Sequence, residues 1–163
     1  MAKKSKKKES GHKGVRIANR KARRDFHILE VLECGIELEG TEVKSLRAGQ
    51  AKIDESYARI DGGQLMLIGA SIAQYPHAKG SLQHAPTRNR KLLVHRRQIA
   101  RLDSHVRQKG KTLIPLAMYF KRGWAKCEIG LAVGKRQYDK RQAIKERQQK
   151  RDIAREMSRR RRR

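Results

Sequence analysis

The stretch that decides the fold is Thr112-Leu-Ile-Pro-Leu-Ala-Met-Tyr-Phe-Lys121, then Arg122-Gly123, then Trp124-Ala-Lys-Cys-Glu-Ile-Gly-Leu-Ala-Val133. Apolar residues alternate along both halves, a pattern typical of strands with one buried side. Arg122-Gly123 is short enough to be the turn of an antiparallel pair. The residues expected on the buried faces are Ile114, Leu116, Met118, Phe120, Ala125, Cys127, Ile129, Leu131 and Val133.

Further strands are expected upstream, over Phe26–Cys34, Ser56–Ile60, Gln64–Ile68 and Ser71–Tyr75. The first has apolar residues at both parities, which indicates partial burial on both faces, and Gly35 after it predicts a bulge or bend. Asp61-Gly62-Gly63 is a strong hairpin signal. About six strands with two inserted helices fit a small closed or partly open barrel, so the predicted class is mainly β.

Two short helices are expected, over Gly40–Gly49 and His95–Lys109. In the first, Thr41 is the expected N-cap and Gly49 the C′ residue. Val43 and Leu46 would then face the body, and Lys44 and Arg47 would form a cationic edge.

Charge is concentrated at the two ends of the chain. The 163 residues carry a formal charge of +26, of which residues 1–24 and residues 134–163 hold net +10 each. This length allows one domain plus tails. Arms of this kind are typical of nucleic-acid binding, because Lys and Arg release counterions from phosphates. A solubilising charge run would mix signs more evenly, and a membrane-surface role lacks an apolar face.

The tail beyond residue 133 has helical propensity but no face to bury against its own body. Asp139 and Gln142 form a capping-box pattern, and Ile153 with Met157 makes a small apolar stripe. We therefore expect residues 134–163 to become helical on a partner, and residues 1–16 to be disordered.

Other classes find little support. No stretch approaches the length of a membrane span, and the N-terminus lacks the apolar region of a secretory signal. Cys34 and Cys127 lie far apart, so reduced thiols in a cytoplasmic protein are expected rather than a metal site. No phosphate-cradling glycine loop or nucleophile motif occurs, so neither a cofactor nor a catalytic residue is expected. Only seven aromatic residues are present, with no exposed cluster expected, which favours shape recognition of structured RNA over base stacking.

Several blocks resemble the SsrA-binding protein (small protein B) family across roughly residues 17–158. The blocks are Asn19-Arg-Lys-Ala-Arg-Arg24, Glu33-Cys-Gly35, Gly40-Thr-Glu-Val-Lys-Ser-Leu-Arg-Ala-Gly49, Arg90-Lys-Leu-Leu93 and Gly134-Lys-Arg-Gln-Tyr-Asp-Lys-Arg141. The resemblance implies an OB-like barrel over residues 17–133 that binds the tRNA-like domain of transfer-messenger RNA. It also implies delivery of that RNA to stalled ribosomes for trans-translation, in the cytoplasm and as a monomer in solution.

The resemblance also implies two sets of site residues. The expected RNA-binding residues are Arg20, Arg23, Arg24, Glu33, Lys44, Arg47, Arg90, Lys91, Leu93 and Lys126. The residues expected in the decoding region and empty mRNA channel of the small ribosomal subunit are Gly134, Lys135, Arg136, Tyr138, Asp139, Lys140, Arg141, Ile153 and Met157. Position 138 is Tyr where several family members carry His.

Two other readings of the residues remain open. A ribosomal protein with basic extensions would have a similar composition, and a nucleoid-associated DNA binder would share the charge. Co-sedimentation of the protein with ribosomes in the absence of any other RNA would favour the ribosomal protein. Preference for duplex DNA over structured RNA would favour the DNA binder.

Overall fold

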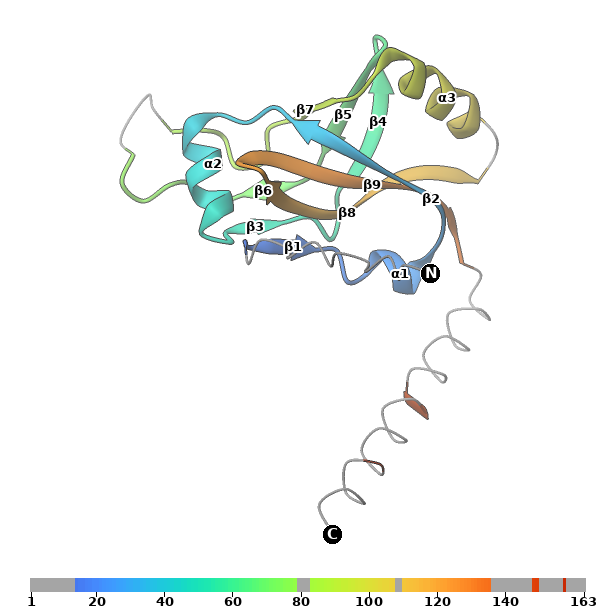
Figure 1. Cartoon of the computed structure of the whole chain (residues 1–163), viewed down its shortest axis with the longest axis horizontal. Helices are drawn as coiled ribbons and strands as arrows, with labels where there is room; N and C mark the ends of the chain where they lie inside the picture. The colour runs from blue at the N-terminus through green and yellow to red at the C-terminus, as the bar shows by residue number, and fades with distance from the viewer. Residues whose placement is uncertain (1–13, 79–82, 108–109, 136–147, 150–156, 158–163) are drawn as a thin grey trace, which may run out of the picture.

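The computed structural model describes residues 14–78, 83–107, 110–135, 148–149 and 157. Within these ranges the chain forms nine strands and three short helices (Figure 1). The strands are β1 (Arg16–Ala18), β2 (Phe26–Ile36), β3 (Ala51–Lys52), β4 (Tyr57–Asp61), β5 (Gln64–Ile68), β6 (Ser71–Ile72), β7 (Arg90–Leu93), β8 (Lys111–Lys121) and β9 (Trp124–Gly134). The helices are α1 (Ala22–Asp25), α2 (Gly40–Arg47) and α3 (Arg96–Val106).

Six strands close a ring, which confirms the predicted mainly-β, OB-like barrel. The sheet runs β1-β8-β4-β5-β7-β2-β9, and β8 also pairs with β9. Every pairing is antiparallel, and β3 and β6 form a separate two-stranded sheet. Closure leaves the barrel with few free strand edges, the feature by which small β proteins avoid edge-to-edge association.

The β8–β9 hairpin is confirmed, but the one-sided burial predicted for β8 is wrong. Its register with β9 shifts between Pro115 and Ala117, so that Leu116 is the extra residue of a β-bulge. A bulge changes which face the following side chains point to. All residues from 113 to 118 are consequently buried: Leu113 and Met118 in the main core, Ile114 and Leu116 in a second cluster with Ala22 and Ala132.

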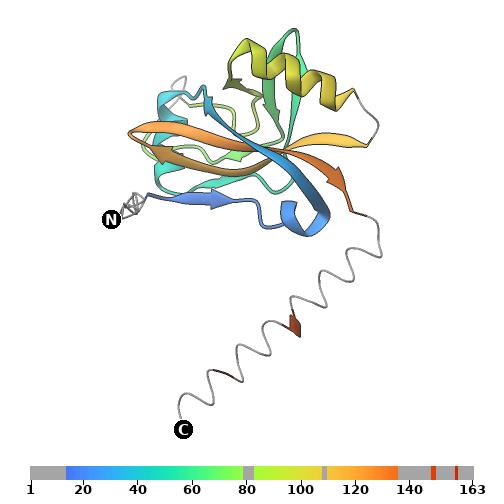
Figure 2. The same cartoon turned by 45° about the vertical axis from the view of Figure 1, so that its right-hand side comes forward.

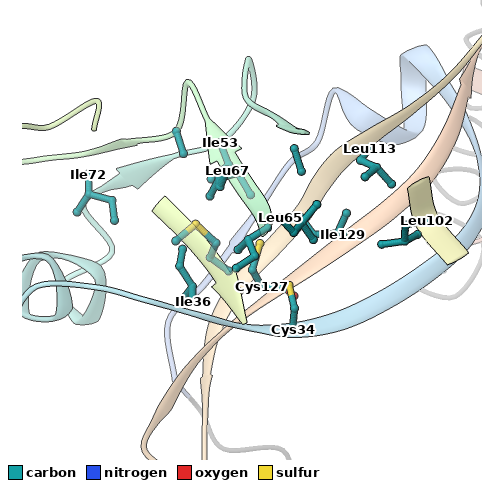
Figure 3. Close-up of a cluster of buried hydrophobic side chains, with 14 of the residues drawn as sticks. Cys34, Ile36, Ile53, Leu65, Leu67, Ile72, Leu102, Leu113, Cys127 and Ile129 are labelled. Carbon is teal, nitrogen blue, oxygen red and sulfur yellow. The ribbon is translucent and has the colours of Figure 1, made fainter. Parts of the chain in front are cut away.

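The main core fills the barrel interior (Figure 3). It is built from aliphatic side chains of the strands, with Leu46 of α2 and Leu102 of α3 closing it from outside. Cys34 and Cys127 are register partners on β2 and β9, and the Cys34 thiol donates to the Cys127 carbonyl at 3.0 Å. The contact with Cys34 and burial raise the pKa of the Cys127 thiol, which keeps it protonated.

Strand β2 runs through Gly35 without a break, so the predicted bulge at this glycine is wrong. Gly35 keeps its register with both β7 and β9, and the shift in β2 falls at Leu29 instead. A Cβ on Gly35 would lie 3.1 Å from the Cβ of Leu93, so close approach of β7 is what favours glycine here. The predicted partial burial on both faces is also wrong, because the alternate residues His27, Leu29, Val31 and Glu33 are all exposed.

Both predicted helices are present, with corrections at their ends. Helix α2 begins one residue earlier than Thr41, and Glu39 is its N-cap in a capping box with Glu42. Thr41 instead contacts the buried ring of His84, its hydroxyl lying 2.8 Å from Nδ1. Gly49 has φ of +78° one residue past the C-cap, as expected for C′.

Two elements near the N-terminus were missed by the sequence reading. Asn19 is buried and donates to the carbonyls of Ile53 and Pro115, while its side-chain oxygen accepts from the Ala22 amide at 2.9 Å. These bonds hold β1 against β8 and start α1. Figure 2 shows α1 beside the end of β9, far along the barrel from the β8–β9 turn. The first strand of the sheet thus begins at Arg16 and the last ends at Gly134, one residue beyond each of the limits, 17 and 133, expected for the barrel.

The predicted strand at 71–75 is short, since β6 covers Ser71–Ile72 alone. Among the described tail residues, Gln148, Gln149 and Met157 have helical backbone. In the described part of the chain, no helix has the length and apolar character needed to span a membrane.

Candidate nucleic-acid interface

One line of side chains crosses the outer face of the barrel, at the end near the β8–β9 turn. Leu93 of β7 is the register partner of Gly35, and Gly35 is the partner of Lys126 in β9. Lys126 in turn pairs with Tyr119 of β8, and Tyr119 with Arg16 of β1. Register partners of antiparallel strands project to the same face. We call these five residues the register row.

The row lies at the surface and is mixed in character: Arg16 and Leu93 are exposed, whereas Tyr119 and Lys126 are half-buried. Leu93 is 52% exposed, whereas its neighbour Leu92 is buried in the core. The Arg16 guanidinium lies 4.9 Å from the centre of the Tyr119 ring and 2.7 Å from the Glu128 carboxylate. Because Gly35 has no side chain, Leu93 packs directly over it, and a Cβ built on Gly35 would lie 3.1 Å from the Leu93 Cβ. An apolar side chain on β7 and a cation on β9 thus flank Gly35.

Glu33 lies two residues from Gly35 on the same side of β2 and reaches across the row. Its carboxylate accepts from the Tyr119 hydroxyl and from the Lys121 ammonium at 3.0 Å. The hydrogen bonds from Tyr119 and Lys121 hold the pKa of Glu33 below its usual value. The group is therefore an ionised hydrogen-bond acceptor at neutral pH, within a cationic surrounding.

The structure thus brings together Glu33, Leu93 and Lys126, which the sequence places far apart. Lys91 projects to the outside of β7 like Leu93, and it is half-buried. Lys44 and Arg47 are exposed on α2, beside the β8–β9 hairpin (Figure 1). The Arg47 guanidinium lies 5.3 Å from the Phe120 ring, and the Lys44 ammonium 5.0 Å from the Tyr75 ring. Arg47 therefore lies beside β8, against the residue that follows Tyr119, and Lys44 lies beside the loop that carries Tyr75.

Arg90 does not belong to this surface, which corrects the sequence prediction. Its side chain is fully buried, and Nε donates to the Glu42 carboxylate at 2.9 Å. The remaining nitrogens donate to the carbonyl oxygens of Ala70, Pro86 and Arg88. With its donors used inside the protein, Arg90 has none to offer a phosphate.

The same carboxylate also binds Arg88, whose Nε donates to Glu42 at 2.9 Å. Glu42 is itself buried; burial would raise its pKa, but hydrogen bonds from Arg88 and the Glu39 amide and the charge of Arg90 hold it below its usual value. We call Glu42, Arg88 and Arg90 the buried cluster. It fastens α2 to β7 and so fixes where Lys44 and Arg47 stand.

A second set of predicted residues lies at the opposite end of β2 and β9. Arg20, Arg23 and Arg24 are exposed around α1, and Arg24 pairs with Asp25 at 2.9 Å. Gly134 pairs with Phe26, and the Lys135 amide donates to the Asp25 carbonyl at 2.9 Å. Lys135 Nζ also donates to the Arg23 carbonyl at 3.0 Å. The predicted tail therefore starts from a point anchored to α1.

A groove of about 450 Å³ lies beside α1, between β8 and the turn before β4. Its lining mixes signs, with Asp54 and Glu55 opposite Lys21 and Arg24. Lys21 and Glu55 pair across it at 3.2 Å. The groove therefore has no clear preference for an anion.

Most of the predicted tail lies outside the described residues. This applies to Arg136, Tyr138, Asp139, Lys140, Arg141 and Ile153. Met157 is described, and its side chain is 67% exposed. In the ranges the structure covers, no group of three or more His, Cys, Asp or Glu side chains is placed to hold a metal ion.

The predicted site left out three outward residues of the row and its border: Arg16, Tyr119 and Trp124. Trp124 is the first residue of β9 and is 75% exposed. Strand alternation could have identified two of these residues. Tyr119 follows the buried Met118 on β8, and Trp124 precedes the half-buried Ala125 on β9. Arg16 required knowledge of β1, which has no clear pattern of its own.

The fold and this surface define a class: a small cationic OB-like barrel with a mixed polar and apolar outer face. The family model described as "SmpB protein" matches residues 16–159. The chain is 49% identical over 162 residues to the SsrA-binding protein of Thermobifida fusca, covering 99% of this chain and 100% of that protein. It is 51% identical over 154 residues to the SsrA-binding protein of Acidothermus cellulolyticus, covering 94% and 95%.

A solved structure described as "tmRNA-SmpB: a journey to the center of the bacterial ribosome" contains a similar chain. The TM-score is 0.62 at 48% identity, with 79% of this chain and 94% of that chain covered. The chain belongs to the SmpB protein family, and the resemblance read from its sequence blocks is confirmed.

Proposed function

We propose that this protein binds the tRNA-like domain of transfer-messenger RNA and delivers that RNA to stalled ribosomes for trans-translation. The observation that carries the proposal is the family match over residues 16–159. The name of the relatives, SsrA-binding protein, and the description of the similar solved structure, tmRNA-SmpB in the bacterial ribosome, support it. Its action is binding and delivery, in the cytoplasm and as a monomer, without a cofactor.

The RNA face consists of the register row with Glu33. Glu33, an ionised acceptor, would take hydrogen bonds from a base or a ribose hydroxyl. Leu93, half exposed over Gly35, would pack on an exposed base, and Lys126 would meet phosphate. Lys44 and Arg47 on α2 and Lys91 on β7 would add phosphate contacts.

The other end of the barrel would face the ribosome. Phe26 and Gly35 are nine residues apart on β2, which corresponds to about 30 Å along an extended strand. One molecule can therefore hold RNA on the register row and present Arg20, Arg23 and Arg24 at the opposite end of β2. The tail from Gly134 would enter the decoding region and the empty mRNA channel, becoming helical there, with Ile153 and Met157 as its apolar stripe.

Recovery of the RNA bound in cells tests the first half of the proposal. Full-length protein should retain one abundant tRNA-like species, and a broad RNA population would contradict the proposal. Glu33→Ala, Leu93→Asp and Lys126→Ala should each reduce the yield. Leu29→Asp is the matched control for Leu93→Asp. Leu29 is similarly exposed, at 55%, but it lies on β2 six residues before Gly35 and therefore outside the register row.

Truncation after Lys135 tests the second half. The cut preserves the bonds of Lys135 to α1, so the barrel should keep its stability and its RNA. Tagging of stalled chains should be lost, since nothing would occupy the decoding region. A truncated protein that still supports tagging would reduce the tail to an electrostatic tether.

A further inference from the structure

Trp124 has the most exposed side chain among the large hydrophobic residues that the structure describes, at 75%. It is also the only tryptophan in the chain. It opens β9, directly after the β8–β9 turn, and makes no contribution to either hydrophobic cluster. Tryptophan carries the largest apolar surface of any side chain, so packing gives no reason for its place here.

The backbone that carries this ring is rigid. Arg122 and Gly123 have φ values of +51° and +84°, which are the values of a two-residue turn with both central residues in the left-handed region. Ladder pairing continues to the turn itself, where Lys121 is the partner of Trp124. Because the backbone is already fixed, a partner that contacts the ring restricts only the side-chain torsions of Trp124.

The neighbours of the ring are cations. Lys121 lies opposite Trp124 on β8, Arg122 precedes it in the turn, and Lys126 lies two residues further on the same face. Lys121 pairs with Glu33, while Arg122 and Lys126 have no ion-pair partner within the described ranges. A hydrophobic protein contact would favour an apolar border, whereas an aromatic face bordered by cations suits a base with its phosphates.

We propose that Trp124 stacks on an unpaired nucleobase of the bound RNA, while Arg122 contacts a flanking phosphate. This inference rests on the function proposed above, and it extends the RNA face from the register row to the β8–β9 turn. It also changes the expected mode of recognition, because shape and phosphate contacts are joined by a stacked base. The RNA must then present an unpaired base next to the structured region that lies on the row.

The single tryptophan makes the test direct. Full-length protein is titrated with the isolated tRNA-like domain of transfer-messenger RNA, while tryptophan emission and RNA binding are followed independently. Stacking should quench the emission with the same midpoint as binding, and should protect the ring from acrylamide. Trp124→Leu should lower RNA affinity about 5- to 100-fold, the range typical of a stacked base. Trp124→Phe should retain most of the affinity.

Leu29→Ala serves as the control for loss of an exposed apolar side chain, and it should bind RNA normally. Thermal unfolding should be unchanged in all three variants, because both positions are exposed. Binding with unaltered tryptophan emission, or Trp124→Leu with wild-type affinity, overturns the inference and leaves the proposed function standing. An equal loss of RNA affinity in Trp124→Leu and Trp124→Phe would also overturn the inference, because it would show that the shape of the indole is required rather than stacking by an aromatic ring. Failure of the wild-type protein to bind this RNA would overturn both.

Discussion

The buried cluster and the register row use the same kinds of residue for opposite purposes. In the cluster, Glu42 and Arg90 are fully buried and their hydrogen bonds are made within the protein. At the row, Lys126 and the neighbouring Glu33 remain accessible, and Glu33 accepts from the exposed Lys121 and the half-buried Tyr119. Burial therefore decides whether a charge stabilises the fold or is available to a ligand. Charge composition by itself gave no means of telling these two sets apart.

Replacing Arg90 should have the largest effect on this contrast. Arg90→Met removes one partner of a buried ion pair and leaves part of the Glu42 carboxylate without a hydrogen-bond donor. The free energy of unfolding should fall by about 3–5 kcal/mol. Lys91→Met, one residue along and pointing outward, should change it by less than about 0.5 kcal/mol. Urea unfolding followed by circular dichroism measures both. Wild-type stability of Arg90→Met with lost RNA affinity would restore Arg90 to the RNA face.

The alternation along β7 could have revealed this difference from the sequence. Leu92 is a core residue, and Arg90, two positions before it, must project to the same side. Lys91 and Leu93 then project outward together. The prediction grouped Arg90 with Lys91 because both are basic and adjacent, and so gave charge more weight than strand periodicity.

Other features depended on partners that local sequence does not show. The hairpin, the Gly62-Gly63 turn, the two main helices and the barrel class follow from periodicity and turn residues, and were predicted. The bulge at Leu116 depends on β9, and the choice of Glu39 over Thr41 as N-cap depends on His84, 43 residues away from Thr41. Asn19 likewise acts through bonds to distant carbonyls. These features depend on tertiary contacts, which cannot be predicted from the local propensity of the sequence.

Gly35→Ala should have an intermediate effect, because the register row is tightly packed even where it is exposed. The added Cβ would lie 3.1 Å from the Leu93 Cβ, so β7 must shift away from β2. Overpacking of this kind costs about 1–3 kcal/mol. Gly134→Ala is the matched control at the other end of the barrel, where nothing lies within 4 Å of the new Cβ. Equal stability of the two variants would show that close approach is unimportant at Gly35.

Tyr119→Phe should have the smallest effect on stability and a clear effect on titration. It removes the hydroxyl that donates to Glu33, and an exposed hydrogen bond of this kind contributes at most about 1 kcal/mol. The pKa of Glu33 is lowered by Tyr119 first and Lys121 second, so it should move back toward its usual value in the variant. A lowered pKa in the folded state gives stability that is present above the unfolded value and is lost as pH falls through the folded one. The difference between wild type and variant should therefore be present at neutral pH and vanish in acid. Carboxyl carbon shifts of Glu33, followed by NMR across pH 2 to 7, measure the change. If the Glu33 pKa is the same in both proteins, the hydrogen bond from Tyr119 to Glu33 does not form in solution, and Lys121 alone is the hydrogen-bond donor to Glu33.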